Sequence, residues 1–500
     1  MQKILSPEQI RAADQYTIKH EPISSIDLME RAANAFSEKF IALFPNSKSI
    51  LLFCGPGNNG GDGLAIARLL SRHATVSVFY LDAKEYSPDF NINLNKLLKR
   101  KNIHTVKISN KENFPVIKNN SIIIDALWGS GLNRNITGLG AELIKHINAS
   151  GAKIVAVDIP SGVFADKPSS SVKIKANYTI TLQQPKLVIL LPQYYEYVGD
   201  WCAIDIGIDR NYINTIDSNY FLVEKNDIHK ILKLRKKFDH KGIFGHALIA
   251  GGSYGKMGAV VMASNACIKS GAGLTTVYIP ACGNKVLQTA IPECMCIMDK
   301  AEKQLSQFNA LKDFKTIGIG IGMGTSPATS KAFLSFLKSY KLPLVLDADA
   351  LNIISSVKKN VSFIPEHSIL TPHPKEFERL FGKAENDFVR LELLKNSAIK
   401  LNCVIVLKGA NTAIATPDGK IYFNTTGNPG MAKGGSGDVL TGIITSFLAQ
   451  GYTSFECAMM GVYLHGLAAD LAIKKIHPNA LVASDIVNHI SDAFKKITVE

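Results

Sequence analysis

The sequence lacks the features that mark membrane, fibrous and exported proteins. Its longest apolar segments, such as 187–191 and 439–448, are shorter than a bilayer span or contain polar residues. No low-complexity, coiled or collagen-like tract interrupts the chain, and its first residues contain no apolar core followed by a small-residue cleavage site. We therefore expect a globular protein with no membrane anchor and no export signal.

Clustered charge and paired cysteines are also missing. The net charge is +14, but the lysines are scattered and no dense basic run contains interleaved aromatic residues, so we expect no nucleic-acid partner. The basic excess can still attract phosphorylated small molecules. The eight cysteines show no zinc-type spacing, and Cys294 and Cys296 have no histidine cluster beside them. This cysteine usage fits a reducing cytoplasm best.

What the sequence does contain is two series of short β runs that alternate with helical stretches, which predicts two parallel α/β sheets. At 500 residues the chain exceeds what one core usually holds. No strong internal repeat connects the two series, so we interpret them as different folds. The first series comprises 49–54, 75–81, 121–127, 152–159 and 178–182, and the second comprises 246–250, 274–279, 316–321, 344–346, 368–370 and 403–407.

The strand signal fades between 211 and 245, where a polar, basic stretch appears. We therefore place a domain at 1–215, a linker at 216–237 and a second domain at 238–500. Near the end of the second series, the runs 412–415 and 420–424 flank Thr416-Pro-Asp-Gly419, a turn sequence that predicts a β-hairpin.

The first glycine-rich segment is Gly55-Pro-Gly-Asn-Asn-Gly-Gly-Asp-Gly63, between a strand and a helix. Backbone N–H groups in such a turn can approach a phosphate. The segment is neither the usual dinucleotide fingerprint nor a Walker loop. Two further strand ends, 125–135 and 157–162, carry Asp, Asn and Ser. Carboxyl ends of parallel strands converge on one crevice, so we expect a pocket, although an isolated Asp there is more often a helix cap.

The second glycine-rich segment, Asn424 to Gly442, leads into an apolar helix. Gly434, Gly435 and Gly437 permit a tight backbone wrap, and the N–H groups at the helix start can bind an anion. Asp438 sits beside this anion site. Burying a carboxylate there is unfavourable unless it has a role or partners, so we interpret Asp438 as a catalytic base rather than a simple cap.

The motifs of the first half resemble the NAD(P)H-hydrate epimerase family, the YjeF N-terminal domain, over about the first 215 residues. The resemblance implies a Rossmann-like three-layer domain that interconverts the R and S hydrates at C6 of the reduced nicotinamide ring. It implies potassium bound by Asn59, Asp125 and Ser161, whose oxygens alone would suit a monovalent or a divalent cation. Asp158 is a plausible acid/base group or a binding group only. The implied hydrate contacts are Asn58, Asn59, Gly60, Gly61, Asp62, Gly129, Ser130, Gly131, Leu132, Asn133, Arg134, Asn135 and Asp158.

The second half, from about Phe238, resembles the ADP-dependent NAD(P)H-hydrate dehydratases, which have a ribokinase-like α/β fold. The resemblance rests on 251–259, 346–351, 371–376, 407–412 and 424–442. One departure is Ile321, where the family commonly has proline, so the fixed φ of that turn is lost. The implied hydrate contacts are Ala259, Gly322, His373 and Asp438, and the implied adenine-nucleotide contacts are Lys408, Gly409, Ala410, Asn411, Thr412 and Gly437.

Both resemblances together imply a repair enzyme that epimerises NADHX and NADPHX and then dehydrates the S form, converting ADP to AMP and phosphate. Asp438 would act as base while ADP phosphorylates the ring hydroxyl, and Mg²⁺ is expected in that step. We also expect a homo-oligomer. Two alternatives stay open: a kinase for a vitamin-precursor alcohol, and a first domain that only binds dinucleotides or proteins.

Overall fold

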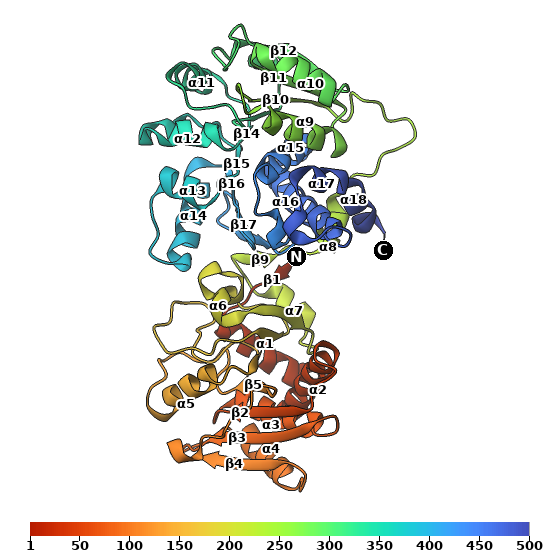
Figure 1. The fold of residues 1–500 in the computed structure, drawn as a ribbon. Coiled ribbons are helices and arrows are strands. Elements are labelled where there is room, and N and C mark those ends of the chain that lie inside the picture. Colours follow the sequence, from red (N-terminus) through yellow and green to blue (C-terminus); the bar gives the residue numbers. More distant parts are fainter. Residues whose placement is uncertain (500) are drawn as a thin grey trace. The chain divides into compact units, whose positions relative to one another are not determined.

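The computed structural model describes residues 1–499 and divides the chain into two compact units (Figure 1). The smaller unit runs from Lys3 to Ser218, and the larger runs from Asn219 to the end of the described chain and includes Met1 and Gln2. The chain passes from one unit to the other within the short strand β1 (Gln2–Lys3). In the described part of the chain, no helix is both long and apolar enough to span a bilayer.

The smaller unit contains a seven-stranded sheet in which all neighbouring strands are parallel. The strand order is β4-β3-β2-β5-β6-β7-β8, so the chain reverses its direction of travel between β2 and β5. A ligand crevice is expected at this switch point, outside the carboxyl ends of the strands. The strands are β2 (Ser49–Cys54), β3 (Thr75–Leu81), β4 (His104–Ile108), β5 (Ile122–Ala126), β6 (Lys153–Val157), β7 (Tyr178–Leu182) and β8 (Asp200–Ile204).

Helices cover both faces of this sheet, which confirms the predicted three layers. Alternate residues of β2 face opposite cores: Ile50 and Leu52 belong to one hydrophobic cluster, and Leu51 and Phe53 belong to the other. The first cluster includes side chains of α2, α3 and α4, and the second includes side chains of α5. The helices are α1 (Pro7–His20), α2 (Ser25–Leu43), α3 (Asn58–Leu70), α4 (Pro88–Leu98), α5 (Gly138–Ala149), α6 (Tyr195–Val198) and α7 (Arg210–Thr215).

The larger unit is built on the sheet β9-β18-β17-β16-β15-β14-β13-β10-β11-β12, in which strands from β16 to β12 are parallel and β16, β17 and β18 are antiparallel. The pairing of β17 with β18 confirms the predicted hairpin. The strands are β9 (Tyr220–Leu222), β10 (His246–Ala250), β11 (Leu274–Ile279), β12 (Met295–Met298), β13 (Ile317–Ile319), β14 (Leu344–Leu346), β15 (Ile369–Leu370), β16 (Val404–Leu407), β17 (Thr412–Ala415) and β18 (Ile421–Asn424).

The interval 216–237, expected to be a linker, contains ordered elements of the larger unit. Strand β9 pairs with β18, and Ile228 of α8 is buried in the core. These elements are short and are followed by an exposed basic stretch, which explains why the sequence pattern concealed them. The helices of the larger unit are α8 (Lys225–Ile231), α9 (Met257–Lys269), α10 (Asn284–Ala290), α11 (Pro327–Ser339), α12 (Asp349–Ser355), α13 (Pro374–Phe381), α14 (Asp387–Leu401), α15 (Ser436–Ala449), α16 (Ser454–Ala472), α17 (Ala483–Asn488) and α18 (Ile490–Thr498).

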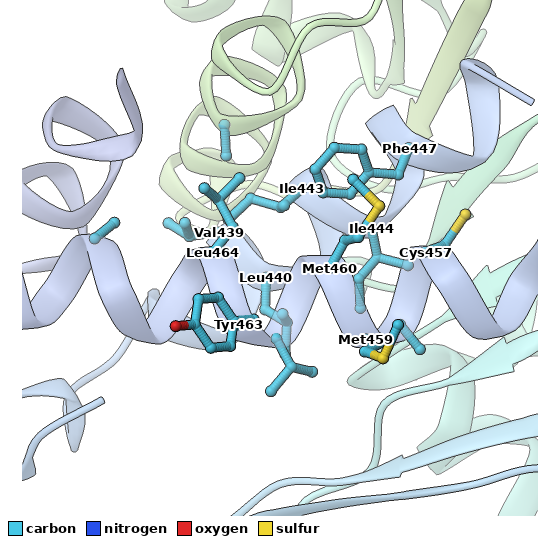
Figure 2. Close-up of a cluster of buried hydrophobic side chains, with 14 of the residues drawn as sticks. Val439, Leu440, Ile443, Ile444, Phe447, Cys457, Met459, Met460, Tyr463 and Leu464 are labelled. Atoms are coloured by element: carbon cyan, nitrogen blue, oxygen red, sulfur yellow. The ribbon is translucent and has the colours of Figure 1, made fainter. Parts of the chain in front are cut away.

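The core of the larger unit is formed largely by α15 and α16, both of which are apolar on most of their circumference. Figure 2 shows this core, with Leu440 and Ile444 of α15 and Met460 and Tyr463 of α16 among its side chains. Helix α15 also packs closely on α9. A Cβ atom at Gly442 would lie only 2.0 Å from the backbone oxygen of Ala263, so a glycine is needed there. Because α15 itself is deeply buried, its N-terminus is held in a fixed position.

Candidate active sites

The smaller unit contains a cavity of about 580 Å³ near the carboxyl ends of β2, β5, β6, β7 and β8. Residues from all three polar strand-end segments line it, as the sequence predicts for a crevice at this edge. The predicted residues on its wall are Asn58, Asn59, Asp62, Gly129, Ser130, Gly131, Leu132, Asn133, Arg134 and Asp158. The wall also includes Asp14 of α1 and Lys186.

Three predicted contact residues, Gly60, Gly61 and Asn135, do not line this cavity. Gly60 is buried, and a Cβ atom there would lie 1.8 Å from the backbone oxygen of Gly55. A Cβ atom at Gly61 would meet the sulfur of Met29. Asn135 donates a hydrogen bond to Ser170 Oγ at 3.0 Å. The two glycines thus allow the turn to pack closely on itself and on α2.

Asp158 occupies a left-handed backbone conformation, with φ of +68°, and its side chain is buried among donors. Lys186 Nζ donates to Oδ1, as do Thr181 Oγ1 and the Leu182 N–H, each at 3.2 Å, while the Ser130 N–H approaches Oδ2 at 3.4 Å. Burial alone would raise the pKa of Asp158, but the Lys186 ammonium and these hydrogen bonds lower it below its ordinary value. Asp158 is therefore a carboxylate at neutral pH.

Two other carboxyl groups on the cavity wall shift in the opposite direction. Burial raises the pKa of Asp14 to about 6, although Lys186 lowers it somewhat, and the Asp158 charge adds to the rise. Burial and the charges of Asp158, Asp14 and Asp89 raise the pKa of Asp62 well above its ordinary value. The cavity therefore contains one permanently ionised carboxylate and two groups that bind protons more readily.

Of the predicted cation ligands, Asp125 and Ser161 are buried and hydrogen-bonded to each other, and the Asn59 side chain lies beside Gly129 of a neighbouring turn. Ser161 Oγ donates to Asp125 Oδ1 at 2.6 Å, and the Ser161 N–H donates to Oδ2 at 2.8 Å. Burial raises the pKa of Asp125 to about 6 despite these hydrogen bonds. The buried Asn59 amide nitrogen has no hydrogen-bond partner. The carboxyl oxygens of Asp125 and the Ser161 hydroxyl are ligands of the kind that a hard cation takes. The unpartnered Asn59 atom is an N–H donor, so only the amide oxygen of Asn59 could join them.

In the larger unit, the carboxyl ends of β14 and β16 are joined by an ion pair. Lys408 Nζ lies 2.8 Å from Asp347 Oδ1. The buried Asp347 also accepts hydrogen bonds from Thr441 Oγ1 of α15 at 2.7 Å and from the Ala348 N–H at 2.8 Å. Asp347 thereby connects two strand ends to the start of α15. The sequence motif 346–351 contained Asp347, but no role had been predicted for it.

Asp438 lies in the first turn of α15, directly after the glycine-rich wrap. Burial raises its pKa to about 7, the negative charges of Asp347 and Asp349 add to the rise, and Lys408 opposes it. Gly435 has φ of +92°, which permits the sharp entry into the helix. A carboxyl group with a pKa near neutrality beside free helix-start N–H groups can exchange a proton at an anion site.

The predicted nucleotide turn, Lys408 to Thr412, lies between β16 and β17 and approaches the start of α15. A Cβ atom at Gly437 would lie 3.4 Å from Lys408 Nζ. Thr412 Oγ1 donates to the Gly409 oxygen at 3.0 Å, which closes the turn, while Gly409 faces open space. In residues 1–499 no group of three or more His, Cys, Asp or Glu side chains is arranged to hold a metal.

The structure brings two of the predicted hydrate contacts together directly. A Cβ atom at Gly322 would lie 3.1 Å from the Cβ atom of Ala259, and Gly322 has φ of +57°. His373 is the N-cap of α13, and its Nδ1 accepts from the Lys375 N–H at 3.1 Å. Burial and the nearby Lys408 charge lower the pKa of His373, so the ring is neutral. His373 thus combines a capping role with a position near the Lys408–Asp347 pair.

Sequence reasoning also missed His465 of α16, which is buried beside the glycine-rich wrap. Its Nε2 lies 3.3 Å from Ser436 Oγ. Burial lowers its pKa to about 4, and the Lys408 charge contributes to the decrease. A neutral His465 can orient the Ser436 hydroxyl at the start of α15. No local motif marked this histidine, because it stands inside a continuous apolar helix.

Comparison with known proteins assigns each half of the chain to a family. Residues 25–188 match the family of YjeF-related protein N-termini, and residues 247–492 match the NAD(P)H-hydrate dehydratase family. The bifunctional NAD(P)H-hydrate repair enzyme Nnr of Moorella thermoacetica is 35% identical, with 96% of this chain and 94% of that protein covered. The Coxiella burnetii protein of the same name is 32% identical, with 96% and 97% covered.

Among solved structures, a ribokinase-like superfamily protein from Enterococcus faecalis is 29% identical, with a TM-score of 0.50, and the match covers 57% of this chain and 98% of that one. This likeness confirms the ribokinase-like fold predicted for the second half. The chain belongs to the family of bifunctional NAD(P)H-hydrate repair enzymes.

Proposed function

We propose that this enzyme repairs hydrated nicotinamide dinucleotides in two reactions, one in each unit. The smaller unit epimerises the R and S forms of NADHX and NADPHX, and the larger unit dehydrates the S form with consumption of ADP, yielding NAD(P)H, AMP and phosphate. The observation that carries the proposal is the near-full-length likeness to bifunctional repair enzymes in a chain that has a carboxyl-lined cavity in one unit and a partly buried carboxyl group at a helix start in the other.

In the smaller unit, the 580 Å³ cavity is the proposed hydrate site. Cavities of this size bury a large part of a small ligand. The Asn58–Asp62 and Gly129–Asn135 segments would bind the dinucleotide, and Asp158 would place a fixed negative charge beside the ring. Asn59, Asp125 and Ser161 would hold potassium, which would neutralise the buried carboxylate and fix the strand-end turns.

In the larger unit, Asp438 would take the proton from the ring hydroxyl as that oxygen becomes phosphorylated. Its pKa of about 7 suits a base that operates near neutral pH. The N–H groups at the start of α15 and the Lys408 ammonium would stabilise the charge of the transferring group. Mg²⁺, when bound with ADP, would neutralise further phosphate charge. Elimination of phosphate from the ring then restores the reduced nicotinamide.

For this site we propose hydrate contacts at Ala259, Gly322, His373 and Asp438, and nucleotide contacts at Lys408 to Thr412 and Gly437. Gly322 and Gly437 support these roles because their missing side chains leave close approaches to Ala259 and Lys408. We assign the epimerase to 1–215 and the dehydratase to 238–500. Action in the cytoplasm and a homo-oligomeric state remain predictions, and light scattering of the purified chain would test the latter.

The test is recovery of reduced-nicotinamide absorbance when the full chain meets separately purified R and S hydrates of NADH. With ADP, we expect the S hydrate to recover at once and the R hydrate to recover after epimerisation. Recovery of the S form alone would leave the dehydratase and exclude the epimerase. No recovery from either hydrate, with formation of a phosphorylated vitamin-precursor alcohol, would instead favour the kinase alternative.

A further inference from the structure

Asp14 stands apart from the glycine-rich motifs, because it comes from α1 and not from a strand-end turn. It nevertheless lines the same cavity as Asp158 and Lys186. In the described chain no hydrogen bond or ion pair engages its partly buried carboxyl group, whereas Asp158 accepts from four donors. Asp14 therefore presents an unpartnered carboxyl group to the space where a ligand would lie.

Burial favours the protonated form of Asp14, and the surrounding charges act on it in both directions. Lys186 is paired with Asp158, so these two charges largely cancel at the cavity wall. Asp62 of α3 is a further carboxyl on the wall, and the side chains of Arg11 and Arg134 are the other cationic groups that line it. Burial and the Asp158 charge together raise the pKa of Asp14 to about 6, against the opposing influence of Lys186. Asp14 can thus exchange a proton close to neutral pH, whereas Asp158 cannot.

We propose that Asp14 is the catalytic acid of the epimerisation. This inference rests on the proposed function of the smaller unit. The Asp14 carboxyl group donates its proton to the C6 hydroxyl, the C6–O bond breaks with its electron pair on oxygen, and water leaves. The N1 lone pair forms the N1=C6 double bond of a cationic ring. Water then adds to the opposite face of C6, and its surplus proton restores the Asp14 carboxyl, so that no oxidant or reductant is needed.

The two carboxyl groups then have different roles that follow from their surroundings. Asp158, held ionised by Lys186, stabilises the positive charge that develops on the ring, and Asp14 supplies the proton. Two carboxyl groups of one site commonly divide acid and electrostatic roles when their environments differ in this way. Among the described residues, Asp158 has hydrogen-bond partners and Asp14 has none.

The test follows the conversion of pure S hydrate to R hydrate by chromatography, with the full chain and without ADP, so that the dehydratase stays idle. We expect Asp14→Asn to lower the enzymatic rate by about 100-fold or more, the usual contribution of a positioned acid. Asp14→Glu should keep at least about a tenth of the wild-type rate. The matched control is Glu8→Gln on the same helix, which does not line the cavity and should behave like the wild type.

The pH profile separates a chemical role from a structural one. The wild-type rate, after subtraction of the spontaneous reaction, should fall above about pH 6 as Asp14 loses its proton, and this fall should disappear in Asp14→Asn. A fully active Asp14→Asn, or an inactive Asp14→Glu together with a wild-type profile that is flat through pH 6, overturns the role of Asp14. A wild-type chain with no epimerisation overturns the proposed function itself.

Discussion

The two units contain similar sets of charged side chains that differ in how deeply they are buried. Each unit contains a lysine–aspartate pair and a further carboxyl group whose pKa is raised: Lys186 and Asp158 with Asp14, and Lys408 and Asp347 with Asp438. The lysines differ in exposure, since the Lys186 side chain is 2% exposed and the Lys408 side chain is 22% exposed. The donor hydrogens of Lys186 are taken up by Asp158, Thr181 and the Leu182 oxygen, whereas Lys408 is partly open to solvent.

The third carboxyl group also differs in where it is anchored. Asp14 lies on α1 at the cavity wall and has no fixed partner in the described chain, whereas Asp438 lies at the dipole-positive start of α15. A carboxyl group without a fixed partner can present its proton to a ligand in the cavity, and one at a helix start suits proton removal next to an anion. The same residue type is thus set to opposite tasks by its position.

The largest expected effect comes from removing Asp438, the proposed base of the larger unit. Asp438→Asn should lower ADP-dependent dehydration of the S hydrate by about 10²- to 10⁴-fold, because the amide cannot accept the hydroxyl proton. Epimerisation without ADP should be unchanged, since that site lies in the other unit. Asp492→Asn on α18, an exposed position, serves as the control. A dehydration rate within about threefold of the wild-type rate would exclude Asp438 as the base.

Breaking each lysine–aspartate pair tests whether burial makes the difference. Lys186→Met should reduce the free energy of unfolding of the smaller unit by about 3–5 kcal/mol, because Asp158 is left buried without its cation. Lys408→Met should cost about 1–3 kcal/mol in the larger unit, since the Lys408 side chain is 22% exposed and the pair is partly open to water.

The measurement is urea unfolding of the full chain, with hydrogen exchange in β7 and β16 reporting each unit separately. Lys175→Met, which removes an exposed pair with Glu196, should change the free energy by no more than about 0.5 kcal/mol. Equal costs for Lys186→Met and Lys408→Met would contradict the distinction between a closed and an open pair.

An effect close to that of Lys408→Met is expected at Thr441, whose hydroxyl donates to Asp347 Oδ2. Thr441→Val should destabilise the larger unit by about 1.5–3 kcal/mol, the usual loss for a hydrogen bond to a charged group. Thr445→Val, one turn further along α15, removes only a hydrogen bond to the Thr441 backbone oxygen and should cost less. Thermal unfolding of both variants would compare them, and the reverse order would show that Asp347 does not depend on Thr441.

The rates of the two reactions should change with pH in opposite directions. Each rate should change by about tenfold per pH unit over the range in which its carboxyl group titrates. A base must be ionised, so dehydration should rise with pH up to about 7, the pKa of Asp438, and then level off. An acid must be protonated, so epimerisation should fall as pH rises above about 6, the pKa of Asp14. Parallel profiles for the two reactions, measured on the same preparation, would remove the functional contrast between the two carboxyl groups.

The sequence predicted the buried strands and the strand-end motifs well, because both depend on local pattern. It did not predict β4, β8, β9 or β12, which are short or lie at sheet edges with mixed polar composition, so their alternation is weak. Lys186 was missed because its partner Asp158 is 28 residues away and only the fold brings them together. Asp14 was missed for the same reason, since α1 reaches the cavity through tertiary packing.

The placement of Asp438 on α15 has a consequence for how this enzyme loses activity. Beyond its first turn, nearly every residue of this helix belongs to the buried core, and Gly442 holds it against α9. The dehydratase site therefore cannot loosen by local fraying while the rest of the unit stays folded. Heat inactivation of this reaction should coincide with cooperative melting of the larger unit, and backbone amides of 439–447 should exchange only through global opening.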